Sequence, residues 1–170
     1  LLKKIFLWMV DYVIVPGNLH KNFIKSLSFN KKIFITKSVG IIKPVSKKNF
    51  SSKKKEIKIV YIGRVSSEKN LKLLFKLIKS TRNLSLSIYG RDEEKLEANL
   101  NNYIKNRIKF KGSILNKKIS SEIKKYDLLI LPSKFEPWGL VIEEAIYNGI
   151  PVISSDKVGC NQDLISKLKV

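Results

Sequence analysis

The chain has 170 residues, a length that suits one ordinary domain or parts of two. Hydrophobic residues make up 44% and charged residues 28% of the sequence, which is typical of a globular rather than a disordered protein. A single cysteine, Cys160, and a single histidine, His20, exclude an internal disulfide, a cysteine-based metal site and a histidine-containing triad within these residues.

The formal net charge is +20, and the excess of lysine is uneven along the chain. Residues 1–55 carry 13 Lys and one Asp, a net +12, whereas residues 56–170 carry 21 Lys or Arg and 13 acidic residues, a net +8. Such a charge favours partners that bear phosphates, but Lys, Ile and Asn are abundant throughout, so many lysines are equally well explained as solvated surface. An anionic membrane surface is the next candidate partner. Nucleic acid is the least favoured, because no RNP-like motif, zinc-finger spacing or arginine-rich run is present.

The first apolar run, residues 5–15, contains Asp11 and has only 11 residues. A transmembrane helix needs about 20 apolar residues, so this run is too short to span a membrane. Nothing in the sequence resembles a signal peptide with a cleavage site. We therefore expect a cytoplasmic protein, with peripheral contact to the cytoplasmic face of a membrane left open.

Residues 11–42 have the pattern of a strand, a helix and a second strand. Residues 11–17 ("DYVIVPG") form an apolar run closed by Pro-Gly, residues 18–28 predict a short helix, and residues 31–38 predict another strand. Residues 43–55 are polar and charged and lack a hydrophobic pattern, which predicts a linker.

From residue 56 onward, apolar strands alternate regularly with amphipathic helices. The expected strands span 57–63, 84–90, 107–112, 127–133 and 151–156, and the expected helices span 66–80, 92–106, 116–126 and 139–149. The second helix is expected to bury Leu96, Leu100, Tyr103 and Ile104. This alternation indicates an α/β domain with a Rossmann-like parallel sheet covered by helices on both faces.

In such sheets ligands bind beyond the carboxyl ends of the strands. Strand 57–63 ends at Gly63 and is followed by Arg64 and Lys69, with Ser66 or Ser67 able to cap the next helix. Two cations beside the free N–H groups of a helix start form a receptor for phosphate. On local evidence the competing interpretation, two surface charges in a basic protein, is at least as strong. Neither a G-x-G-x-x-G fingerprint nor a Walker A loop is present.

Strand 127–133 leads to the same edge of the predicted sheet. Glu136 projects from the loop that follows, and Glu144 lies one to two turns into the next helix. At the start of that helix the N–H groups of Gly139, Leu140 and Val141 have no intrahelical acceptor. Carboxylates accept hydrogen bonds from sugar hydroxyls, and amides and cations bind anions, so this set could hold a molecule that bears both hydroxyls and phosphates.

The helix that carries Glu144 has two further faces. Ile142, Ala145 and Ile146 are expected to pack toward the sheet. Glu143 is interpreted as lying on an exposed face without a role in binding. A Glu143 variant is therefore the expected control for variants of Glu136 and Glu144.

At this point the sequence resembles a known family. The stretches "GRVSSEK", "FEPWGLVIEEA" and "VGCNQDLI" occur in the order found in group 1 glycosyltransferases, which are retaining, nucleotide-sugar-dependent enzymes of the GT-B fold. The Gly-Arg-x4-Lys and Glu-x7-Glu elements carry most of the resemblance. It implies that residues 1–42 are the end of an N-terminal, acceptor-side domain, 43–55 a linker, and 56–170 a truncated C-terminal nucleotide-sugar-binding domain.

The resemblance implies roles for the basic residues. Arg64 and Lys69 match the family's basic pair on the donor diphosphate, where they would counter the charge that builds up on the leaving group. Gly63, directly before them, is assigned to the donor site with them. Family members generally need no metal ion for catalysis, so neither a metal nor another cofactor is expected here.

The resemblance also implies roles for the acidic loop and helix. Glu136 matches the first glutamate, placed against the transferred sugar, and with Arg64 and Lys69 completes the expected catalytic set. Glu144 matches the second glutamate, placed on the ribose hydroxyls. The amides of residues 139–141 match those beside the sugar and the diphosphate. Trp138 stands where phenylalanine is common.

The implied function is transfer of a hexosyl group from a nucleotide-sugar donor to a glycan or lipid-linked acceptor with retention of configuration, as in polysaccharide biosynthesis. Because most of the acceptor-side domain is missing, the sequence is interpreted as a piece of a longer enzyme, and the isolated chain is expected to be inactive. Three alternatives stay open: a GT-B enzyme of another reaction type, such as a phosphorylase or epimerase; a basic nucleic-acid-binding protein; and an inactive gene remnant.

Overall fold

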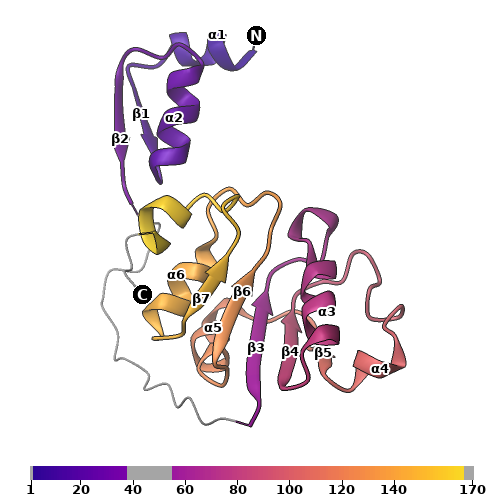
Figure 1. Ribbon diagram of the computed structural model, residues 1–170. Helices are drawn as coiled ribbons and strands as arrows, with labels where there is room; N and C mark the ends of the chain where they lie inside the picture. The colour runs from indigo at the N-terminus through magenta and orange to yellow at the C-terminus, as the bar shows by residue number, and fades with distance from the viewer. Residues whose placement is uncertain (1, 38–54, 167–170) are drawn as a thin grey trace.

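The computed structural model describes residues 2–37 and 55–166, which form a small first unit and a larger second unit (Figure 1). The first unit consists of α1 (Leu2–Trp8), β1 (Tyr12–Val15), α2 (Asn18–Ser26) and β2 (Lys32–Ile35). Its strands pair in parallel, with Tyr12 opposite Lys32, as the strand–helix–strand pattern predicts. The predicted linker falls, except for Lys55, outside the described residues, so the proposed domain boundaries stay a prediction.

The second unit alternates strands and helices as expected. Its elements are β3 (Ile57–Ile62), η1 (Ser67–Lys69), α3 (Leu71–Ser80), β4 (Leu84–Tyr89), α4 (Asn102–Lys105), β5 (Ile108–Phe110), α5 (Asn116–Ile123), β6 (Leu128–Leu131), α6 (Leu140–Tyr147), β7 (Val152–Ser154) and η2 (Asn161–Ile165). Among the described residues, no helix in either unit is both long enough and apolar enough to cross a membrane.

The five strands of the second unit form one parallel sheet in the order β5-β4-β3-β6-β7. The chain moves from β3 outward to β5 and then crosses back to β6, so the direction of winding reverses between β3 and β6. Helix α3 packs against α4 and α5 packs against α6. Figure 1 shows α3 in front of the sheet and α6 behind it, which confirms the predicted Rossmann-like architecture with helices on both faces.

The core of this unit forms where the near-continuous apolar strands predict it. Val60 and Tyr61 on β3 are fully buried, and so is Ile88 on β4. Leu74 and Ile78 of α3 are buried in the same core. Each such aliphatic side chain contributes about 1.5–3 kcal/mol through removal from water, so the sheet is a rigid base for the loops at its edge.

The prediction of a helix over residues 92–106 is wrong, because the structure has only the short helical turn α4 in this range. The Asp92 carboxylate accepts hydrogen bonds from the N–H groups of Leu96 (3.1 Å) and Glu97 (2.9 Å), and Lys95 has a left-handed backbone with φ 52°. These side-chain bonds compete with the helical ladder and favour a turn. Tyr103 is exposed as a result, although Ile104 is buried as expected.

Candidate functional site

The two loops singled out in the sequence meet where the winding of the sheet reverses. One loop follows β3 and carries Lys69, and the other follows β6 and carries Glu136. Lys69 Nζ lies 2.8 Å from Glu136 Oε2, and the two side chains are only 11% and 19% exposed. An ion pair this far from solvent is rare in proteins unless both partners are held in place, so it marks a fixed polar centre at the ligand edge.

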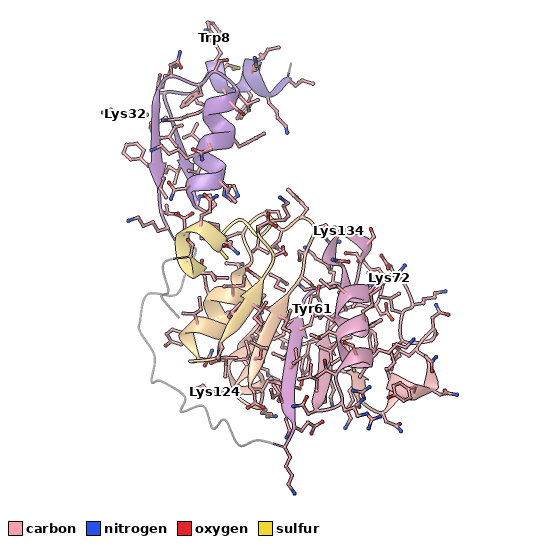
Figure 2. All side chains as sticks on the ribbon, viewed as in Figure 1. Trp8, Lys32, Tyr61, Lys72, Lys124 and Lys134 are labelled. Atoms are coloured by element: carbon pink, nitrogen blue, oxygen red, sulfur yellow. The ribbon has the colours of Figure 1, made fainter. Side chains whose placement is uncertain are left out.

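Backbone contacts fasten the two loops together. The N–H of Lys134 donates to the carbonyl of Glu68 at 2.7 Å, and Asn70 Nδ2 donates to the carbonyl of Pro132 at 3.4 Å. In Figure 2, Lys134 lies on the loop beyond the end of β6, above Tyr61 on β3. The relative position of Lys69 and Glu136 is therefore set by the backbone and not by their side chains alone.

The sequence predicts a helix over residues 66–80 that includes Lys69, but in the structure Lys69 lies before α3. It ends the short 3-10 turn η1, and Asn70 then takes a left-handed conformation with φ 56°, so that α3 begins only at Leu71. Ser66 precedes η1 without forming a capping hydrogen bond from its side chain. The turn of the chain at Asn70 places Lys69 over the end of β6.

Arg64 and Gly63 lie at the end of β3, where the ion pairs of Arg64 are to Glu68 and Glu93. Its side chain is 63% exposed and lies 3.7 Å from both Glu68 and Glu93. Gly63 donates its N–H to the carbonyl of Tyr89 at 2.9 Å, which continues the sheet by one residue. Arg64 is therefore an exposed cation at the rim, in contrast to the buried Lys69.

Tyr61 forms the floor beneath this pair of loops. Its hydroxyl donates to the carbonyl of Arg64 at 2.7 Å. Burial raises the pKa of Tyr61, and the negative charges of Glu136 and Glu68 raise it further, while Arg64 lowers it. The phenol therefore stays neutral and serves as a hydrogen-bond donor that fixes the backbone after β3.

The loop that carries Glu136 is held by a second segment of chain. The N–H of Glu136 donates to Lys157 (3.2 Å), and the carbonyl of Glu136 accepts from Gly159 (2.9 Å). Gly139 then has φ 94°, a conformation that favours glycine, and an added Cβ would lie 2.8 Å from Val158. Among the described residues, none accepts a hydrogen bond from the N–H groups of residues 139–141, as predicted for a helix start.

The two carboxylates of α6, Glu143 and Glu144, are both shielded from solvent, although Glu143 was expected to be exposed. Glu144 is half-buried, and this burial raises its pKa, with a further contribution from the charge of Glu143. Glu143 is only 7% exposed and accepts a hydrogen bond from the indole N–H of Trp138, so the prediction that it lies on an exposed face is wrong. The loop folds back over the first turn of α6, and helical periodicity alone does not show this. Glu143 is therefore unsuitable as a neutral control.

A cleft lies between the two units, as the resemblance implies, but apart from Leu140 its lining residues were not among the predicted site residues. It has a volume of about 610 Å³ and is lined by the ends of β1 and β2 on one side and by the start of α6 on the other, including His20, Thr36, Trp138 and Leu140. The rings of His20 and Trp138 are 5.9 Å apart. The one available signal in the sequence was His20, the only histidine, which lies near the start of the helix expected over residues 18–28.

Comparison with known proteins explains this arrangement. The sequence profile described as "Glycosyl transferases group 1" matches residues 42–169, three quarters of the chain. The chain belongs to the group 1 glycosyltransferases. The match includes both loops of the site and the segment that holds them.

Curated relatives of this glycosyltransferase chain are considerably longer. The poly(glycerol-phosphate) alpha-glucosyltransferase of Bacillus subtilis is 31% identical over 139 residues, which cover 78% of the chain and 20% of the relative. The GtfA subunit of a UDP-N-acetylglucosamine–peptide N-acetylglucosaminyltransferase from Streptococcus pneumoniae is 28% identical over 168 residues, covering 92% of the chain and 32% of the relative. The chain thus spans about a fifth to a third of these relatives.

Solved glycosyltransferases have the same fold. The apo form of the lipopolysaccharide outer core galactosyltransferase WaaB has a TM-score of 0.70 and 28% identity, over 92% of this chain and 46% of that one. The pneumococcal O-GlcNAc transferase GtfA, in complex with UDP and GlcNAc, has a TM-score of 0.70 and 25% identity, over 90% of this chain and 31% of that one. These likenesses confirm the GT-B type of the fold.

The roles assigned to individual residues of this glycosyltransferase stay predictions. The structure brings Lys69 and Glu136 into contact and puts the amides of residues 139–141 at the start of α6, directly after the loop that carries Glu136. Arg64 is left at the exposed rim, with its ion pairs to Glu68 and Glu93. Within the described ranges, no group of three or more His, Cys, Asp or Glu side chains could hold a metal ion.

Proposed function

We propose that the chain is the donor-binding part of a retaining glycosyltransferase, which transfers a hexosyl group from a nucleotide sugar to a glycan or lipid-linked acceptor. The observation that carries the proposal is the Lys69–Glu136 pair at the point where the sheet reverses its winding. Ligands of open α/β sheets bind at this point. The solved relative GtfA, in complex with UDP and GlcNAc, supports a nucleotide-sugar donor.

The chemistry of the pair fits the two halves of such a donor. Lys69 has three N–H donors, of which Glu136 occupies one, so two remain for phosphate oxygens. The second oxygen of the Glu136 carboxylate is available to accept from sugar hydroxyls. The amides of residues 139–141 start α6 beside Glu136 and would stabilise the negative charge that develops on the diphosphate as the sugar leaves.

The remaining predicted residues complete the proposed site. Arg64, at the exposed rim, would swing onto the outer phosphate, exchanging weak ion pairs for a charge-assisted hydrogen bond. Glu144 would accept hydrogen bonds from the ribose hydroxyls. Its pKa is raised by burial, so a pair of hydroxyl donors would offset part of the cost of its charge. No metal or cofactor is needed in this proposal, because cations and amides neutralise the diphosphate.

Calorimetric titration of the chain with UDP tests the donor site. Lys69→Ala is expected to weaken UDP binding by about 10- to 100-fold, the range for a lost hydrogen bond to a charged group. Lys79→Ala is the matched control, because Lys79 is exposed at the opposite end of α3 and its loss changes the net charge equally. Equal affinities of wild type and Lys69→Ala would refute the assignment, and equal weakening by both variants would show that bulk charge alone is responsible.

Transfer itself requires a chain that includes the acceptor side. Mass analysis of the products formed from a labelled nucleotide sugar distinguishes transfer with retention from a phosphorylase or epimerase reaction. The isolated chain is expected to show no transfer, and sugar transfer by the 170 residues alone would contradict this.

A cytoplasmic protein in peripheral contact with an anionic membrane is the location we propose. Its support is the net +12 of residues 1–55 together with the exposed apolar side chains of α1, among them Leu2, Phe6 and Trp8. Sedimentation with phosphatidylglycerol vesicles, but not with phosphatidylcholine vesicles, is the expected result. Equal sedimentation with both would oppose this.

A further inference from the structure

The two units are joined by a carboxylate at the start of α2. The residue before this helix is Gly17, which has no side chain to cap it. Asp163, buried in the π-helical turn η2, instead accepts hydrogen bonds from the N–H of Asn18 (2.8 Å) and from Asn18 Nδ2 (2.5 Å). Figure 1 shows η2, in yellow, beneath the lower end of the first unit. A carboxylate at a helix N-terminus is favoured by the helix dipole and by the free N–H groups.

Gly17 is shaped for this contact. Its φ of −160° is extended backbone that any residue adopts, so its own unit does not require glycine. An added Cβ would lie 2.3 Å from Asp163 Oδ2 and 2.5 Å from the ring of Trp138. The absence of a side chain at this position is therefore explained by the close approach of the second unit.

A short path of hydrogen bonds leads from Asp163 to the candidate site. The N–H of Asp163 donates to the carbonyl of Cys160 (3.1 Å), and the N–H of Cys160 donates to the carbonyl of Trp138 (3.0 Å). One residue earlier, the N–H of Gly159 donates to the carbonyl of Glu136 at 2.9 Å. The segment that holds the Glu136 loop thus ends in the carboxylate that binds the first unit.

We propose that Asn18 and Asp163 form a latch between the units, and that Asp163 is a positioning residue for the Glu136 loop. When the latch is closed, Trp138 lies between Gly17 and Glu143, and the ladder formed by residues 136–138 and 157–160 is complete. When it opens, the first unit releases both Trp138 and η2, and the ladder loosens. The relevance of the latch to sugar transfer rests on the proposed function, whereas its existence does not.

Exchange of the two side chains provides the test. Asn18→Asp places two carboxylates against each other, and Asp163→Asn removes the charge and places two amide groups face to face. In the double variant, the amide of residue 163 accepts from the backbone N–H of residue 18 and donates to its new carboxylate, so both hydrogen bonds return. A role of Asp163 within its own unit would not be rescued by a change in the other unit.

Amide hydrogen exchange, resolved at Asn18, Gly159 and Cys160 in the 170-residue chain, is the measurement. Each single variant is expected to accelerate exchange at all three amides by about 10- to 100-fold, and the double variant to restore protection. Asp156→Asn, which removes an exposed carboxylate that forms an ion pair with the adjacent Lys157, is the matched control and should change none of them.

Three outcomes would overturn the proposal. The first is that exchange at Asn18 stays unchanged in both single variants. The second is that the double variant does not restore protection. The third is that the single variants accelerate exchange at Asn18 but leave exchange at Gly159 and Cys160 unaltered. The last outcome would mean that the contact joins the units without positioning the loop. Gly17→Ala should reproduce the single variants, because its added Cβ would lie closest to Asp163 and Trp138 of the second unit. No nucleotide is present in this experiment, so failure of UDP binding would count against the proposed function and leave the latch unaffected.

Discussion

Removal of either partner of the Lys69–Glu136 pair should destabilise the protein measurably. Lys69→Met keeps the length and most of the apolar stem of the side chain but removes the ammonium group, and Glu136→Gln keeps the shape but removes the charge. Because the two side chains are 11% and 19% exposed, each variant leaves a mostly buried charge without its partner at 2.8 Å. Loss of a partner costs about 3–5 kcal/mol for a fully buried pair and about 0–1 kcal/mol for an exposed one.

The partial exposure of Glu136 places this pair between those limits. We therefore expect each single variant to lower the free energy of unfolding by about 1.5–3 kcal/mol, the range for hydrogen bonds to charged groups. The double variant removes both charges and should cost less than the two single variants together, by a coupling energy of about 1–2 kcal/mol. Urea denaturation of the four proteins, followed by far-UV circular dichroism in the absence of any nucleotide, measures all three quantities.

Additive losses would refute this reasoning. They would show that Lys69 and Glu136 are each solvated in solution and do not act as a pair, and that the fixed polar centre at the sheet edge does not exist. Arg64→Met is the internal comparison, because its ion pairs are 3.7 Å long and its side chain is 63% exposed. It should change the free energy of unfolding by less than about 0.5 kcal/mol.

Three further predictions follow from the carboxylates. Glu144→Gln should raise the Tm at pH 7.5 but not at pH 4. The raised pKa means that the charged form of Glu144 opposes folding, and this cost vanishes once the carboxyl is protonated. The gain in Tm should be about 2–4 °C for each kcal/mol of stability gained. Trp138→Phe removes the indole donor to Glu143 and should cost about 1–3 kcal/mol in urea denaturation, most of which Glu143→Leu in the same chain should restore; no recovery would contradict the contact. Hydrogen bonds from Lys125 and the Tyr89 hydroxyl lower the pKa of Glu122. The contribution of Glu122 to stability is therefore present above its unfolded pKa and is lost as the pH falls through its folded pKa. The decrease of the Tm between pH 6 and pH 3 should be smaller in Glu122→Gln than in the wild type.

Much of the fold could be predicted from hydrophobic patterning, because parallel strands buried on both faces must be apolar along their whole length. The strands at β3, β4 and β6 were found in this way, and so was the α/β class. The expected helix over residues 92–106 failed for a local reason: the short Asp92 side chain reaches backbone N–H groups that a helix would need. Apolar periodicity in that segment was present but did not decide the structure.

The edge of the site was predictable for a topological reason. The carboxyl ends of parallel strands lie on the same side of a sheet, so residues that follow different strands, such as Lys69 and Glu136, are brought together. Their actual contact was not predictable, because it depends on the left-handed Asn70 between η1 and α3. The burial of Glu143 and the Asn18–Asp163 contact were missed because they depend on how a loop and a second unit fold over the helix, and no sequence period records this.

The buried pair also indicates what this edge of the sheet is suited to do. A buried ion pair is often no more stabilising than two apolar side chains of the same volume, because both charges lose their hydration. Stability alone therefore gives no reason for Lys69 and Glu136 to occupy this space in place of methionine and leucine. Their placement at the reversal of the sheet, beside the unpartnered amides that begin α6, is explained if the ammonium and carboxylate are held ready for a ligand with an anionic and a hydroxylated part. Stability is then given up at Lys69–Glu136 and regained at neighbouring contacts that bind no ligand, the Lys134–Glu68 backbone bond and the Asn18–Asp163 latch.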